Sequence, residues 1–250
     1  MTLDEQKAVS GTLEELYSQR PNIGGLSEER ILRCLKILRQ VRGDRFLDVG
    51  CADGQITLAL SEAVGAREAW GVDIAPEAVA AARSRGVNAF QANLDHQDLP
   101  LPPEHFDVVY CGEVIEHVFD PEHLLLEIRR VLKPGGLCLL TTPNLAGWPN
   151  RVALLLGFQP FPTSATPGHE GLGKLLFKGE EGQWGHIRVF TLRALKELLK
   201  LTGLELVKVE GCAVTIKNRH PLAPVVSFVD RLFARYPSAA NRVILLLRKA

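Results

Sequence analysis

The stretch Phe46–Thr57, which reads FLDVGCADGQIT, constrains the fold more than any other part of the chain. It opens with a short apolar run that is typical of a buried strand. Gly50 and Gly54 then bracket a tight turn, because glycine takes positive φ freely and leaves room for a ligand against the backbone. From Ile56 to Val64 apolar residues recur at helical spacing. A strand, a glycine turn and a helix N-terminus present backbone N–H groups to a ligand, as in several nucleotide-cofactor folds.

A carboxylate about 20 residues after this turn narrows the choice. Trp70 to Val72 reads as a second strand, and Asp73 closes it. Doubly wound folds place here the acid that holds a ribose, although a solvated helix cap has the same pattern. The turn also departs from the G-x-G-x-x-G of NAD-binding loops, because Ala52 and Gln55 replace two of the glycines. A dehydrogenase is therefore a weak hypothesis.

The turn resembles motif I of the class I S-adenosylmethionine-dependent methyltransferases, whose pattern is roughly D-x-G-x-G-x-G. Asp48, Gly50 and Gly54 match this pattern, and Ala52 replaces a usual glycine. The strongest family signal is FDVVYCGEVIEHVFDPEHLLLEIRRVLKPGGLCLLTTPN, which ends at Asn144. The resemblance extends over residues 45–144 and, more loosely, over residues 186–211.

The resemblance implies S-adenosyl-L-methionine as the cofactor, S-adenosyl-L-homocysteine as the product, and a set of residues that hold the cofactor. Asp48 would bind the methionine ammonium, and Asp73 both ribose hydroxyls. Asn93 would accept a hydrogen bond from the adenine amino group while Leu94 packs on the ring, although an ordinary polar loop has the same composition. Gly112 would pass close to the methionine portion. The expected cofactor-binding residues are Asp48, Gly50, Cys51, Ala52, Gly54, Asp73, Ile74, Asn93, Leu94 and Gly112.

An E-x-x-E-H cluster follows the fourth expected strand, and it consists of Glu113, Glu116 and His117. If this turn is helical, the three residues share one face. His117 could act as the general base for an acceptor hydroxyl, with Glu116 beside it. Alternatively the cluster and His186 could hold Mg²⁺, Mn²⁺ or Zn²⁺, as similar residues do in small-RNA 2′-O-methyltransferases. Similar EH pairs also occur in methyltransferases with no known metal, and we favour a site without one.

Strands and helices alternate along the chain, which predicts an α/β fold of three layers with a Rossmann-like parallel sheet. The resemblance implies seven strands in the order 3-2-1-4-5-7-6, with strand 7 antiparallel. We expect an N-terminal helical cap over residues 1–42 and a Rossmann-like methyltransferase domain over residues 43–250. Residues 145–185 form an insertion after strand 5, which we interpret as a substrate lid.

Composition limits the partners. The 29 basic and 29 acidic residues cancel, so there is no overall positive field to attract nucleic acid. The last 40 residues are more basic, and residues 222–233 have an amphipathic helical pattern that either packs on the domain, as we favour, or touches a lipid surface. Five scattered cysteines without C-x-x-C spacing predict reduced thiols and a cytoplasmic location. We expect neither a signal peptide nor a membrane-spanning segment.

We therefore expect a methyltransferase that acts on a small-molecule or lipid-linked acceptor, with a hydroxyl as the group that is methylated. A metal-assisted RNA 2′-O-methyltransferase is the alternative enzyme. A non-catalytic protein that binds S-adenosylmethionine and acts through a partner would keep the same cofactor residues.

Overall fold

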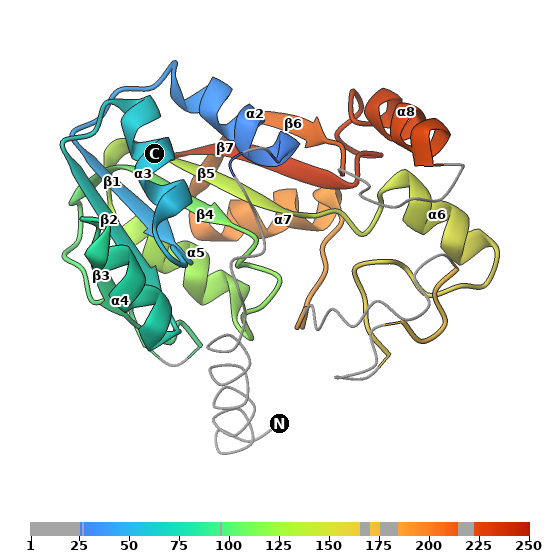
Figure 1. Cartoon of the computed structure of the whole chain (residues 1–250), viewed down its shortest axis with the longest axis horizontal. Coiled ribbons are helices and arrows are strands. Elements are labelled where there is room, and N and C mark those ends of the chain that lie inside the picture. Colours follow the sequence, from blue (N-terminus) through green and yellow to red (C-terminus); the bar gives the residue numbers. More distant parts are fainter. Residues whose placement is uncertain (1–25, 27, 96, 166–170, 176–184, 215–222) are drawn as a thin grey trace.

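A seven-stranded sheet forms the centre of the molecule in the computed structural model of the chain (Figure 1). The structure describes residues 26, 28–95, 97–165, 171–175, 185–214 and 223–250. The strand order is β3-β2-β1-β4-β5-β7-β6, and β7 is antiparallel to both of its neighbours. The strands are β1 (Arg45–Val49), β2 (Glu68–Asp73), β3 (Asn88–Gln91), β4 (Phe106–Gly112), β5 (Leu132–Pro143), β6 (Leu204–Cys212) and β7 (Arg242–Lys249). This arrangement confirms the predicted fold class.

Helices cover both faces of the sheet and so complete the three layers. They are α2 (Glu29–Leu38), α3 (Gln55–Val64), α4 (Pro76–Ser84), α5 (Pro121–Val131), α6 (Trp148–Leu155), α7 (Leu192–Thr202) and α8 (Ala223–Phe233). Successive strand residues point to opposite faces. Phe46 accordingly packs with Leu38 and Leu60 of α2 and α3, whereas Leu47 packs in the cluster that contains α5 and α7. Figure 1 shows α3 and α4 in front of the sheet and α5 and α7 behind it.

Capping residues in the sequence mark where α5 and α7 begin. The Asp120 side chain caps α5 by accepting from the His123 N–H at 3.0 Å, and Pro121 is the first helical residue. Thr191 caps α7 in the same way. The fifth strand begins at Leu132, directly after α5, although the following Lys-Pro-Gly-Gly has the composition of a turn. Leu132 already pairs with Phe106 of β4, and a register shift absorbs the intervening residues.

The described part of the predicted cap is chiefly α2, and the described part of the predicted insertion contains α6. Residues 1–25, 27, 166–170 and 176–184 lie outside the described residues, so the domain boundaries and the lid role of residues 145–185 stay predictions. All five cysteines are buried and free, as expected of reduced thiols. Among the described helices, each is too short or too polar to cross a bilayer.

The sheet register brings the carboxyl ends of the central strands to one edge. Val49 of β1 pairs with Val72 of β2 on one side and with Cys111 of β4 on the other. Gly112, the last residue of β4, pairs with Thr141 of β5. The turns that follow β1, β2, β3, β4 and β5 therefore lie along the same edge, which is where ligands bind in open α/β sheets.

Candidate active site

The turn after β1 is the centre of this edge. Gly50 and Gly54 have φ of 83° and 80°, so both take the left-handed conformation that the sequence predicts. A Cβ on Gly50 would overlap the side chain of Val114, which explains why a side chain does not fit there. Ala52 also has a positive φ, 45°, and is therefore strained where the related motif has glycine. The N–H of Gly50 donates to the Val72 carbonyl at 2.8 Å, which fastens the turn to β2.

Asp73 lies at the end of β2, facing this turn. Its carboxylate accepts hydrogen bonds from the N–H groups of Ala52 and Ala75, at 2.8 and 3.0 Å. Burial raises the pKa of Asp73, and these backbone donors oppose the shift. The carboxylate thus fixes the turn after β1 and retains lone pairs that could accept from ribose hydroxyls.

Asp48 is buried under the same turn, with 2% of its surface exposed. One carboxylate oxygen accepts from the Thr57 hydroxyl at 2.6 Å. The other, Oδ1, is buried and has no hydrogen-bond partner among the residues that the structure describes. Burial raises the pKa of Asp48 to about 7. An unpaired buried oxygen is costly, so this position suits a cationic ligand group such as the methionine ammonium.

The remaining predicted cofactor residues lie along the same edge. Asn93 and Leu94 are in the turn after β3, where the Asn93 side chain accepts from the Asp95 N–H at 3.1 Å and half-buried Leu94 packs on the core. Gly112 ends β4, and a Cβ there would overlap the Tyr110 hydroxyl. Cys51 belongs to the turn after β1, and Ile74 follows Asp73. The structure therefore brings the predicted set to one edge of the sheet.

Arg30 is a residue that the sequence analysis missed. It projects from α2, is 8% exposed, and donates to the Tyr110 hydroxyl of β4. Its Nε is buried and has no partner among the described residues. The Arg30 guanidinium is close enough to the carboxylates of Glu113 and Asp48 to interact with them electrostatically. The signal for Arg30 was its place on the apolar face of an amphipathic helix, where a charge needs a partner.

The turn after β4 is not helical, so the condition for a shared face of the E-x-x-E-H cluster is not met. Glu113 has φ of 59°, and its carboxylate turns to Arg242 of β7, at 3.0 Å, and to the Thr141 hydroxyl, at 3.1 Å. Burial disfavours ionisation, but Arg242 and Arg30 outweigh it and hold the pKa of Glu113 below its usual range. Glu113 is thus an ionised carboxylate that already has a counter-ion.

Glu116 has the opposite character. It is completely buried, and one of its oxygens accepts from the Thr142 hydroxyl at 2.9 Å. Its other oxygen, Oε1, has no hydrogen-bond partner among the described residues. Burial and, after it, the charge of Glu113 raise the pKa of Glu116 well above its usual range. The environment of Glu116 therefore favours its protonated, neutral form unless a cation binds beside it.

His117 and His186 meet next to Glu116. Their ring centroids are 4.8 Å apart, and backbone bonds from residues 187 and 188 to the Glu116 carbonyl hold the two segments together. Nδ1 of His117 lies 3.1 Å from the Gly185 carbonyl, and Nδ1 of His186 lies 2.8 Å from the Pro162 carbonyl. Because a carbonyl can only accept, each Nδ1 carries a proton, and Nε2 is then the acceptor nitrogen of the neutral ring. Ligand atoms of Glu116, His117 and His186 lie within 4.8 Å of one another, so the group could move a proton or hold a divalent cation.

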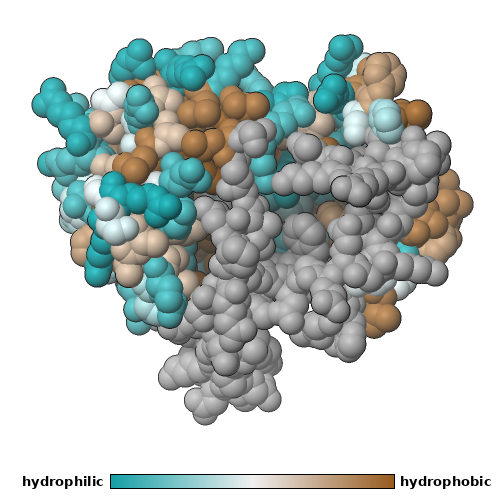
Figure 2. All heavy atoms as spheres, in the orientation of Figure 1, coloured by the Kyte–Doolittle hydropathy of each residue, from teal (hydrophilic) through white to brown (hydrophobic). Residues whose placement is uncertain are grey.

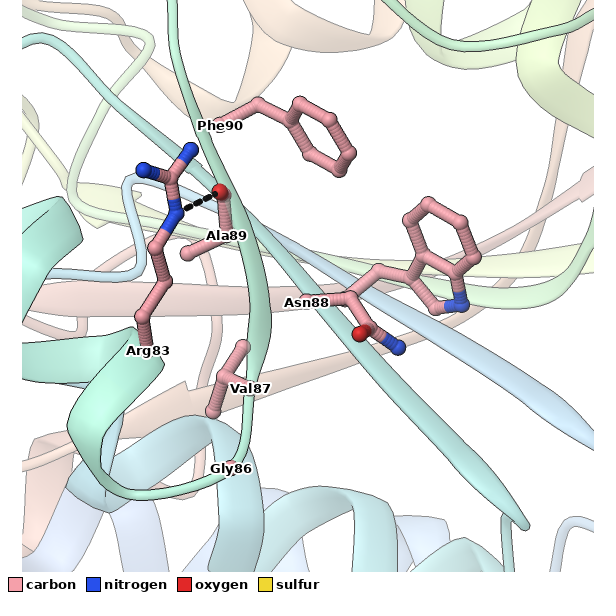
Figure 3. A pocket seen from close by; sticks show the side chains of 7 residues that line it. Arg83, Gly86, Val87, Asn88, Ala89 and Phe90 are labelled. Carbon is pink, nitrogen blue, oxygen red and sulfur yellow. Dashed lines mark hydrogen bonds between the residues drawn. The ribbon is translucent and has the colours of Figure 1, made fainter.

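A pocket at the outer edge of the sheet lies away from these residues (Figure 3). Its lining comes from β3, from the end of α4 and from Trp70, which stacks on Phe90 with ring centroids 5.8 Å apart. Figure 3 shows Arg83 donating to the Ala89 carbonyl beside it. None of the predicted cofactor residues lines this pocket, so we do not assign it to the reaction.

Comparisons with known proteins agree with this geometry. Residues 20–209 match the family model described as a methyltransferase domain. The chain is 30% identical over 216 residues to the demethylmenaquinone methyltransferase of Staphylococcus carnosus, which covers 82% of this chain and 86% of that protein. It is 33% identical over 206 residues to the ubiquinone biosynthesis O-methyltransferase of Cereibacter sphaeroides, covering 80% and 74%.

Solved structures agree on the fold. The S-adenosylmethionine-dependent methyltransferase of Mesorhizobium loti superposes with a TM-score of 0.60 at 18% identity, over 90% of this chain and 100% of that one. The family match covers more than half of the chain. The chain therefore belongs to the class I S-adenosylmethionine-dependent methyltransferases.

Proposed function

We propose that this enzyme methylates a ring hydroxyl of a small-molecule or lipid-linked acceptor of the quinone type. The observation that carries the proposal is the position of His117, whose acceptor nitrogen lies at the same sheet edge as the predicted cofactor residues. The names of the two relatives, one for demethylmenaquinone and one for O-methylation in ubiquinone biosynthesis, support the acceptor class.

The residues present fit the cofactor. Asp48 offers an unpaired buried oxygen for the methionine ammonium. We assign the ribose hydroxyls to Asp73, and the adenine to Asn93 and Leu94. When bound, S-adenosylmethionine supplies an activated methyl group for in-line displacement. The protein contributes mainly position and exclusion of water.

His117 is our candidate general base. The Gly185 carbonyl holds its Nδ1–H, so Nε2 is the nitrogen that can take the hydroxyl proton. Glu116, whose protonated form is favoured, lies beside His117. Its carboxyl can ionise and so balance the positive charge that His117 gains. General-base catalysis of this kind typically contributes about 10²- to 10⁴-fold in rate.

One observation favours the metal-assisted alternative. Each of the two imidazoles donates its Nδ1–H to a backbone carbonyl, which is the outer-shell arrangement usual for histidines that bind metal. Two such nitrogens and the Glu116 carboxylate would form a site with two histidines and one carboxylate. In that case a cation, rather than His117, would activate the hydroxyl, and RNA would become a candidate acceptor.

The decisive experiment combines binding and turnover. Calorimetric titration with S-adenosylhomocysteine should show binding by the wild type and loss of binding in Asp73→Ala. Methyl transfer should then be measured to a short-chain prenylated hydroquinone with one free ring hydroxyl, with its fully methylated form as the control acceptor. Binding without transfer to any acceptor, including a short single-stranded RNA, would favour the non-catalytic protein. Absence of cofactor binding would contradict the assignment of the site.

Variants separate the base from the metal. His117→Gln should lower kcat about 10²- to 10⁴-fold without changing the affinity for S-adenosylhomocysteine. His105→Gln is the matched control, because His105 lies before β4, at the opposite edge of the sheet. The metal-assisted mechanism predicts a different result. EDTA should then remove the activity and Mn²⁺ or Mg²⁺ should restore it, and Glu116→Gln and His186→Ala should also be inactive. This outcome would show that a bound metal, rather than His117 as general base, activates the hydroxyl.

A further inference from the structure

Exposed apolar side chains gather on two neighbouring helices at one end of the molecule. Figure 2 shows them as brown spheres at the right-hand end, over α6 and α8 of Figure 1. On α6 and the residue after it, Leu155 is 85% exposed and Leu156 is 58% exposed. On α8, Phe228 is 71% exposed. The apolar end face, as we name it, consists of Val152, Leu154, Leu155, Leu156, Val225, Phe228, Leu232 and Tyr236.

The spacing of these residues places them in one stripe along α8 and in another along α6. Val225, Phe228 and Leu232 recur at helical intervals along α8, and Val152 and Leu155 do so along α6. A surface helix of a globular protein usually points such a stripe at the core. Here the outward face is the apolar one, and contiguous exposed patches of this kind mark interaction sites.

The two helices are fixed to one another beneath this face. The rings of Trp148 and Phe233 stack with centroids 5.5 Å apart. Trp148 also donates its indole N–H to the Asp230 carboxylate at 2.8 Å. The start of α6 is thus packed against α8 beneath the exposed stripes.

The exposed charges in the described segments that carry the apolar end face have a single sign. Arg151, Arg231 and Arg235 are exposed beside it. The acidic residue of the same segments, Asp230, is 1% exposed and points inward to Trp148 and Asn241. Described residues 145–165, 171–175 and 224–241 contain no exposed Asp or Glu. Apolar side chains rimmed by arginines match an anionic lipid surface, where the rings and aliphatic chains enter and the cations meet head groups.

The face is also connected to the candidate active site. α6 begins shortly after β5, and its Asn150 donates to the Asn144 carbonyl at the end of that strand. Asn150 also accepts from the N–H of Phe161, next to Pro162, whose carbonyl binds His186. Hydrogen bonds through Asn150 and the segment of Phe161 and Pro162 therefore link α6 to His186.

We propose that the apolar end face binds the surface of an anionic lipid bilayer. A second copy of this chain is the less suitable occupant, because a symmetric contact would bring the same arginines together without opposing acids. The inference goes beyond the proposed function, since adsorption to a bilayer needs neither cofactor nor acceptor. It would, however, let an acceptor with a lipid tail reach the enzyme without leaving the membrane.

The test is cosedimentation of the full chain with vesicles of phosphatidylcholine alone or mixed with phosphatidylglycerol, without cofactor. We expect binding to the mixed vesicles only, and weaker binding at high salt. Phe228→Glu and Leu155→Glu should each lower binding at least tenfold. Leu201→Glu is the matched control, because Leu201 is 69% exposed on α7, away from the face, and should bind like the wild type. Arg231→Ala with Arg235→Ala should lower binding about 25-fold, at about fivefold for each arginine.

Three results would overturn the proposal. The first is equal sedimentation with and without phosphatidylglycerol. The second is an equal loss of binding in Leu201→Glu. The third is a wild-type dimer in light scattering that Phe228→Glu converts to a monomer while vesicle binding is absent, because the face would then bind a second copy. Circular dichroism of each variant confirms that it is folded, and binding of S-adenosylhomocysteine is measured separately, so failure here leaves the proposed function untouched.

Discussion

Replacing Asp48 by Asn tests whether the buried carboxylate under the turn after β1 is kept for a cationic ligand. Its Oδ1 has no partner among the described residues, and burial raises its pKa from 3.8 to about 7. The folded protein therefore holds a proton that the unfolded chain releases near pH 4. Stability from this group is complete below pH 4 and is lost as the pH rises to about 7.

The size of the effect follows from the pKa shift. A shift from 3.8 to about 7 corresponds to at most about 4 kcal/mol of unfolding free energy, at about 1.4 kcal/mol for each pKa unit. Asp48→Asn has the same shape and cannot ionise, so at pH 8 it should be more stable than the wild type by up to this amount. Near pH 4 the two proteins should be equally stable. Thermal unfolding of both proteins across this pH range measures the difference.

Cofactor binding should change in the opposite direction. A hydrogen bond from an ammonium to a carboxylate contributes about 1.5–3 kcal/mol, so Asp48→Asn should weaken S-adenosylhomocysteine binding about 10- to 150-fold at pH 8. Because the ligand needs the ionised form, wild-type affinity should fall about tenfold between pH 8 and pH 6. The variant should lack this dependence. Identical pH profiles for the two proteins, or a variant less stable than the wild type at pH 8, would refute the reasoning.

Three shorter predictions concern other residues of the site. Arg30→Ala should weaken S-adenosylhomocysteine at least tenfold if Arg30 meets the methionine carboxylate, and should leave methylthioadenosine, which lacks that group, unchanged in the same titration. Ala52→Gly should relieve the left-handed strain and raise the unfolding free energy by up to about 1 kcal/mol, which is about 2–4 °C in Tm, with cofactor affinity retained. Arg242→Met should remove the counter-ion of Glu113, raise the pKa of that carboxyl and shift any loss of activity at low pH toward neutral pH.

Local signals were enough to predict the turns beside the strands, whereas the strand order came from the family resemblance. Gly50, Gly54 and Asp73 each mark a place where the backbone must turn at a strand end, and such requirements are written in neighbouring residues. The length of β5 could not be read in the same way. Leu132 joins the sheet by pairing with Phe106, a partner far away in the sequence, although the intervening Lys-Pro-Gly-Gly reads as a break.

The different protonation of Glu113 and Glu116 could not be predicted from neighbouring residues for a related reason. The sequence predicted that both residues share one helical face. In the structure, the positive φ of Glu113 directs its side chain to Arg242. Arg242 is far away in the sequence and lies there because β7 pairs antiparallel with β5. Glu116 is left with Thr142 and with the repulsion of its ionised neighbour. Burial, and after it the charge of the ionised Glu113, therefore favours the protonated form of Glu116 beside two imidazoles. The site can therefore accept one positive charge, which is either the proton taken by His117 or a bound cation. The different protonation of the two glutamates depends in part on the salt bridge between Glu113 and Arg242, which no sequence motif contains.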